Sequence, residues 1–319
     1  MPIKINSFGG PIVWFFRKYC SAYTSKIALE FTAKKYAKVI DDYIHSFITD
    51  KQPPIFKMVN IETVNRCNGT CAFCPANVRD ERRERKVMAQ ELFEKIILEL
   101  KTINWRGQIF LNINNEPLLD KHIEERARFI KDQLGDHVII SMFTNGSLLT
   151  PKRLTKLKWG GVDELIINNY SKSYRLNSQQ KKIYQYVKSN PDPFKKMKIV
   201  INRRYSEEIL ATRAGLAPNK KKRNNKVFES CIYPYTDITI FPDGKVGLCC
   251  NDCYEVTDYG NVSKQTLVEI WESPQFIDLR KEMQKGRLAV PFCVECDVVD
   301  SGFREQLIKK SNEVLFSEK

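Results

Sequence analysis

Seven of the ten cysteines fall into two sets whose spacing suits metal chemistry. The first set is Cys67, Cys71 and Cys74 in the run CNGTCAFC, directly after a strand predicted at 58–62. Thiolates favour zinc and iron–sulfur centres, and a structural zinc site normally closes with four ligands. Three thiolates leave one position open, so we expect a 4Fe–4S cluster whose fourth iron binds a substrate or cofactor. The alternative is a zinc site completed by a distant ligand.

The second set lies in the C-terminal third of the chain. An Asp243-Gly244 turn between two apolar runs predicts a hairpin that brings Cys231 and Cys249 together. A CxxC pair, Cys293 and Cys296, offers two further thiolates. Four converging thiolates close a site, and their spacing alone allows either zinc or a 4Fe–4S cluster.

The elements around these cysteines divide the chain into three predicted regions: a helical N-terminal extension (1–55), a strand–helix alternation (56–212) and a small irregular domain (213–319). Alternation of this kind predicts an α/β fold with parallel strands. The expected strands are 58–62, 108–113, 137–143, 164–168 and 197–201, and the expected helices are 89–102, 121–134, 151–158 and 267–284.

The first cysteine run resembles the signature of radical S-adenosylmethionine (SAM) enzymes. The resemblance implies a partial (β/α)6 TIM-like barrel, in which three cysteines hold a 4Fe–4S cluster and SAM chelates its fourth iron. Reduction would cleave SAM to a 5′-deoxyadenosyl radical that takes a hydrogen atom from the substrate. The protein would supply orientation and exclude water.

Residues at other strand ends match further motifs of that family. The run Asn114-Asn115-Glu116-Pro117 stands where the family has GGEP, and its glutamate could accept from the SAM ammonium group. Both glycines are asparagine here, a residue that tolerates unusual backbone angles. The cofactor-binding residues implied by the resemblance are Phe73 against the adenine, Asn115, Glu116, Asn145 in a TNG run, Asn169 at the ribose, and Arg213.

The C-terminal region resembles the SPASM/twitch extension of radical SAM enzymes. The run from Cys231 through Gly244 to Cys249 fits its opening motif, and Arg213-Ala-Gly215 lies upstream. There is no cysteine after Cys296, so the resemblance implies one auxiliary 4Fe–4S cluster, held by Cys231, Cys249, Cys293 and Cys296. This shortened arrangement is similar to the radical SAM dehydrogenases of aminoglycoside biosynthesis. The resemblance covers residues 56 to 300.

A closed auxiliary cluster indicates electron transfer, so we expect oxidation of an alcohol to a ketone. A cysteine outside both sets, Cys250 or Cys253, could instead return a hydrogen atom and make the enzyme an epimerase. Both thiols could also be small buried residues or alternative ligands, and Cys20 is predicted to be structural. Peptide maturation and a non-catalytic metal scaffold are two further hypotheses.

A net charge of +14 indicates an anionic partner. We expect a small phosphorylated or nucleotide-linked sugar or cyclitol, and no nucleic acid. The loop Arg79–Lys86 could bind phosphate or could be a solvated surface. The electron donor would be a low-potential protein such as flavodoxin or ferredoxin. No signal peptide or membrane span is recognised, so a cytoplasmic location is expected, with peripheral membrane contact through the N-terminal segment as an alternative to simple packing.

Overall fold

A single eight-stranded sheet organises the computed structural model, which describes residues 2–7, 55–77, 83–172, 175–204, 211–218 and 227–298. The strand order is β1-β6-β5-β4-β3-β2-β7-β8, and every neighbouring pair is parallel except β7 with β8. The strands are β1 (Ile3–Ser7), β2 (Met58–Ile61), β3 (Gln108–Phe110), β4 (Ile139–Thr144), β5 (Glu164–Tyr170), β6 (Lys198–Arg204), β7 (Asp237–Ile240) and β8 (Val246–Gly247).

The N-terminal strand differs from the expected helical extension. Residues Ile3–Ser7 pair in parallel with β6, and Ile3 is buried whereas Lys4 is exposed. This alternation is the pattern of a half-buried strand. The parallel strand at the β6 edge of the sheet therefore comes from the start of the chain. The periodic segment 36–48, the aromatic run 14–16 and Cys20 lie outside the described residues.

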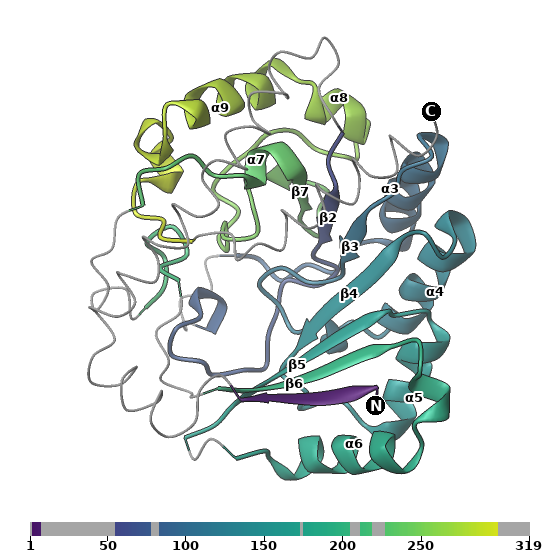
Figure 1. Cartoon of the computed structure of the whole chain (residues 1–319). Helices are drawn as coiled ribbons and strands as arrows, with labels where there is room; N and C mark the ends of the chain where they lie inside the picture. The colour runs from purple at the N-terminus through teal and green to yellow at the C-terminus, as the bar shows by residue number, and fades with distance from the viewer. Residues whose placement is uncertain are drawn as a thin grey trace, which may run out of the picture.

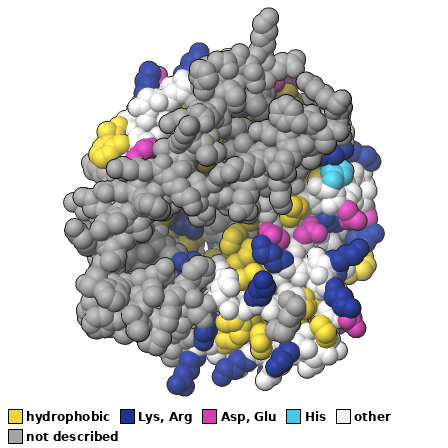
Figure 2. All heavy atoms as spheres, viewed as in Figure 1, with side chains coloured by type: hydrophobic (Ala, Val, Ile, Leu, Met, Phe, Trp, Pro, Cys, Tyr) yellow, Lys and Arg dark blue, Asp and Glu magenta, His cyan; other side chains and the backbone are white. Residues whose placement is uncertain are grey.

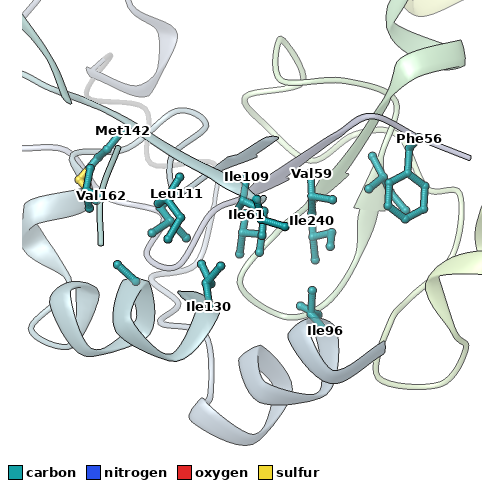
Figure 3. Packing of buried hydrophobic residues seen from close by; sticks show 14 of the residues in the cluster. Phe56, Val59, Ile61, Ile96, Ile109, Leu111, Ile130, Met142, Val162 and Ile240 are labelled. Atoms are coloured by element: carbon teal, nitrogen blue, oxygen red, sulfur yellow. The ribbon is translucent and has the colours of Figure 1, made fainter. Parts of the chain in front are cut away.

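Four helices cover one face of the sheet, as Figure 1 shows. The side chains that they bury meet the strands in one hydrophobic core, where Ile96 and Ile130 point from helices towards Val59, Ile61 and Ile109 (Figure 3). The opposite face of the sheet carries polar side chains such as Asn60, Gln108 and Ser141 together with the stacked rings of Phe110 and Phe143. The helices are α3 (Gln90–Thr102), α4 (Ile123–Leu134), α5 (Pro151–Trp159) and α6 (Ser178–Ser189), with short 3-10 helices at Pro75–Asn77, Pro117–Leu119 and Asp192–Phe194.

The C-terminal region adds strands β7 and β8 to the sheet and three helices above it (Figure 1). The predicted hairpin is present: Gly244 has φ +85°, and an added Cβ would meet Asn261 Oδ1 at 2.8 Å. The single helix expected over 267–284 is two helices, because Ser273 caps a new one and Pro274 begins it. The helices are α7 (Tyr233–Thr236), α8 (Leu267–Trp271) and α9 (Pro274–Gln284), with 3-10 helices at Arg287–Ala289 and Pro291–Cys293.

The described surface mixes both signs of charge. Figure 2 shows Lys and Arg side chains spread over the described part of one face, with Asp and Glu side chains among them. Within the described residues, no helix combines the length and apolar character needed to cross a membrane.

Candidate active site

The first cysteine set lies in the loop that follows β2. Cys67, Cys71 and Cys74 are each half-buried. Burial, then the neighbouring thiols of Cys74 and Cys67, raise the pKa of Cys71 to about 12. The backbone N–H of Gly69 donates to Cys67 Sγ at 3.3 Å. The three thiols are therefore close neighbours in one loop, as the spacing predicts.

Glu116 joins three loops at the carboxyl end of the sheet. Its carboxylate is 1% exposed and accepts from Thr144 Oγ1 at 2.6 Å, from Asn145 N at 2.7 Å and from Leu118 N at 3.2 Å. Its own N–H donates to the carbonyl of Arg66, the residue before Cys67. Burial raises the pKa of this carboxyl. Glu116 thus holds the loops after β3 and β4 against the cysteine loop.

The two neighbouring asparagines supply polar groups at the same place. Asn145 Nδ2 donates to Asn68 Oδ1 at 2.9 Å, inside the cysteine loop. Asn115 Oδ1 accepts from Ile113 N, but Asn115 Nδ2 is buried and has no hydrogen-bond partner in the described part of the chain. A buried donor without a partner is costly, so this amide suits a bound acceptor such as the carboxylate of SAM.

The residues expected at the adenine and ribose lie at the end of β5. The Phe73 ring packs on Tyr170 with centroids 4.8 Å apart. Asn169 is buried, and its Nδ2 donates to the carbonyl of Arg175 at 2.9 Å. Asn169 shares a sheet face with the core residues Leu165 and Ile167, because side chains alternate along a strand.

The opposite face of these strands carries a row of amides that sequence reasoning missed. Asn202 Nδ2 donates to Asn168 Oδ1 at 3.0 Å, and Asn6 Nδ2 donates to Asn202 Oδ1 at 3.4 Å. The three asparagines occupy matching register positions on β5, β6 and β1. The signal that could have identified this row is the alternation of side chains along the strand, which puts Asn168, and not Asn169, on the same face as Ile166.

The second cysteine set converges in the C-terminal region. Burial, with contributions from the thiols of Cys250, Cys296, Cys231 and Cys293, raises the pKa of Cys249 well above its usual range. Within the described residues, no group of three or more His, Cys, Asp or Glu side chains is spaced to hold a single metal ion. A 4Fe–4S cluster holds its thiolates further apart than a single metal ion does. Cysteines too widely spaced for one ion are therefore compatible with cluster binding.

Residues 212–215 connect the two cysteine sets. Thr212 N and Oγ1 both donate to Asp297 Oδ1, at 2.6 and 3.0 Å, and the backbone N–H of Ala214 donates to the Cys296 thiol. Arg213, between them, donates to Asn114 Oδ1 and lies beside the thiol of Cys74. Arg213, Ala214 and Gly215 have φ values of +48°, +54° and +79°. Such strained backbone is typical of functional sites.

Cys250 and Cys253 both lie near the Arg213 guanidinium. Strand β8 ends at Gly247, so Cys249 and Cys250 both lie beyond it. The Cys250 carbonyl accepts from Asn114 Nδ2 at 3.1 Å. Cys253 is fully buried beside Cys74, and burial raises its pKa to about 12. Cys253 therefore lies beside both Arg213 and the first cysteine set, whereas Cys250 lies beside Arg213 and Cys249 of the second set.

The charged loop after the first cysteine set docks onto the C-terminal region. Arg83 is 9% exposed, and its Nη1 lies 2.6 Å from Glu62 Oε2 and 3.0 Å from Glu255 Oε1. Lys86 Nζ lies 2.6 Å from Asp243 Oδ2. Arg83 is therefore buried and paired, in contrast to both interpretations of this loop, whereas the paired Lys86 side chain is 33% exposed and Glu84 and Arg85 are exposed. Residues 78–82 lie outside the described part.

Two family models match this chain. The radical SAM superfamily matches residues 61–168, which include the first cysteine set, and the SPASM iron–sulfur cluster-binding domain matches residues 231–297, which include the second. The chain therefore carries a radical SAM domain followed by a SPASM domain. These domains imply a 4Fe–4S cluster with SAM, and an auxiliary iron–sulfur cluster.

One relative indicates a more specific activity than the two family models do. The S-adenosyl-L-methionine-dependent 2-deoxy-scyllo-inosamine dehydrogenase of Niallia circulans is 26% identical over 253 residues, which are 79% of this chain and 97% of the relative.

Solved structures support the fold. The crystal structure of BtrN in complex with AdoMet and 2-DOIA has a TM-score of 0.67 at 24% identity, covering 78% of this chain and 95% of BtrN. A BtrN structure in an open conformation has a TM-score of 0.57 at 22% identity, with the same coverage.

Proposed function

We propose that this protein is a radical SAM dehydrogenase that oxidises an alcohol of a sugar or cyclitol to a ketone. The observation that carries the proposal is the similarity to the inosamine dehydrogenase over 97% of that relative. The convergence of Cys231, Cys249, Cys293 and Cys296 supports it, because a site closed by four thiolates suits an electron acceptor.

The two cysteine sets would hold the two clusters, Cys67, Cys71 and Cys74 the first and the four C-terminal cysteines the second. When bound, SAM and the clusters supply a hydrogen-atom acceptor and an acceptor for the remaining electron. The chain supplies position: Glu116 holds the loops, Asn115 Nδ2 offers a donor, and Phe73 with Tyr170 offers an aromatic surface to the adenine. Asn145, Asn169 and Arg213 complete the proposed SAM-side set.

The substrate would lie over the polar face of β5 and β6. Amide groups such as Asn168 and Asn202 can donate to and accept from hydroxyl groups. Arg213, between the two cysteine sets, offers a positive charge there. With the net charge of +14, this supports an anionic substrate, including phosphorylated or nucleotide-linked forms. Three further proposals rest on the sequence alone: a flavodoxin or ferredoxin as the reductant, a cytoplasmic location, and membrane contact by the N-terminal segment.

Epimerisation is the second candidate, and the position of Cys253 favours it. This thiol is buried beside Arg213 and Cys74, between the two cysteine sets. A thiol there could return a hydrogen atom to a substrate radical, and Cys250 lies near the same arginine.

The mass of the product after turnover in deuterium oxide separates the two reactions. A panel of cyclitols, sugars and their phosphates, starting with 2-deoxy-scyllo-inosamine, is screened for 5′-deoxyadenosine formation that depends on the added compound. Dehydrogenation gives a product that lacks two hydrogens. A product of unchanged composition that carries one deuterium, and that disappears in Cys250→Ala or Cys253→Ala, would establish the epimerase instead, because thiol protons exchange with water.

A further inference from the structure

Arg287 is a buried cation in the SPASM domain. It is 3% exposed and begins the 3-10 helix Arg287–Ala289. Its backbone N–H donates to the Phe228 carbonyl at 3.2 Å. The preceding Gly286 has φ +101°, and a Cβ there would meet Phe228 O at 2.6 Å. These contacts with Phe228 fix the backbone of residues 286 and 287, and therefore the position of the Arg287 Cα.

The guanidinium reaches the second cysteine set. Its Nη1 lies 3.5 Å from Cys296 Sγ and 3.4 Å from the Cys296 carbonyl, and its Nε donates to the Glu229 carbonyl at 3.1 Å. The thiols of Cys231 and Cys293 are also close enough to affect its charge. In the described ranges Arg287 has no carboxylate as an ion-pair partner.

A buried cation without a counter-ion is strongly unfavourable. The thiolates of a bound cluster are the anions that this position faces. Neutral groups also donate to the same set: Asn251 Nδ2 lies 3.9 Å from Cys249 Sγ, and the Ala214 N–H donates to Cys296. Arg287 differs from both because it brings a full positive charge.

We propose that Arg287 raises the reduction potential of the auxiliary cluster by its charge and by its hydrogen bond to Cys296. Reduction adds one negative charge to a cluster, so a fixed cation and an N–H donor at a ligand sulfur stabilise the reduced form more than the oxidised form. The effect makes the auxiliary cluster a stronger electron acceptor. The benefit of a stronger electron acceptor for catalysis rests on the proposed dehydrogenase function, whereas the effect of Arg287 on the reduction potential does not.

The test is a redox titration of the auxiliary cluster followed by electron paramagnetic resonance. The full chain carries Cys67→Ala, Cys71→Ala and Cys74→Ala, so that only the second set can hold a cluster. Arg287→Gln is compared with Lys281→Gln, which removes the same charge from an exposed position. We expect Arg287→Gln to lower the equilibrium constant for reduction at least tenfold, about 59 mV for one electron. Lys281→Gln should leave it unchanged.

A second measurement applies if Arg287→Gln does not retain its iron. The chain with Arg287 intact is grown with arginine labelled with ¹⁵N in the guanidinium, and hyperfine spectra of the reduced cluster are recorded. A ¹⁵N coupling that disappears in Arg287→Lys is the expected result. An unchanged potential in an iron-loaded Arg287→Gln chain, or no ¹⁵N coupling with Arg287 intact, would overturn the proposal. A lowered potential, together with undiminished ketone formation by Arg287→Gln in a chain whose first cysteine set is intact, would instead count against the auxiliary cluster as the electron acceptor.

Discussion

Replacement of Cys71 by alanine is expected to abolish reductive cleavage of SAM. In the proposed site three thiolates would hold the first cluster and leave one iron open to SAM, so the loss of one thiolate should leave the cluster unable to hold that open iron next to SAM. The same outcome is expected for Cys67→Ala and Cys74→Ala. The measurement is 5′-deoxyadenosine formed by the reconstituted protein with dithionite and SAM.

The matched control is Cys20→Ala, which removes a cysteine that belongs to neither set. It should form 5′-deoxyadenosine at the rate of the unchanged chain. Undiminished formation by any of the three loop variants would contradict the assignment of the first cysteine set.

Replacement of both Cys293 and Cys296 by alanine is expected to stop ketone formation while SAM cleavage continues. These two residues supply half of the thiolates proposed for the auxiliary cluster, whereas the first set lies in a separate loop after β2. The substrate radical would then have no acceptor for its second electron. The measurement is the ratio of 5′-deoxyadenosine to ketone, which should rise steeply as the two become uncoupled.

The outcome of the double variant also bears on the choice of reaction. If the double variant has lost the auxiliary cluster and still forms ketone at an unchanged ratio of 5′-deoxyadenosine to ketone, the auxiliary cluster is not the electron acceptor. The single variant Cys253→Ala provides a comparison: a dehydrogenase keeps its ketone product there, since no hydrogen atom is returned to the substrate.

The sequence predicts the strands well where local patterns are strong. β2 and β5 begin at the expected residues, Met58 and Glu164, because short β-branched runs are bounded by turns. The cysteine sets and the polar strand ends also lie where expected, since parallel strands bring their carboxyl ends to one edge. Helix α6 was missed although Asn177 and Gln180 form a capping box, because its apolar residues are sparse.

Contacts between residues far apart in the chain could not be predicted from local sequence patterns. β1 joins β6 across almost 200 residues, and no local pattern identifies its partner. Arg83 is separated by 172 residues from Glu255, so this one side chain of a charged run that suggests solvent is buried between two acidic side chains, whereas Glu84 and Arg85 are exposed. Arg287 likewise shows nothing in its local sequence that indicates contact with Cys296.

The iron and sulfide content of the anaerobically reconstituted chain tests the central claim most directly. Two clusters predict about eight iron and eight sulfide atoms per chain, and about four of each in Cys231→Ala, which should lose the auxiliary cluster alone. Cys231 is buried beside the other three cysteines of its set, so its removal opens that site without touching the first. About four irons in the unchanged chain, with no further loss in Cys231→Ala, would contradict the account.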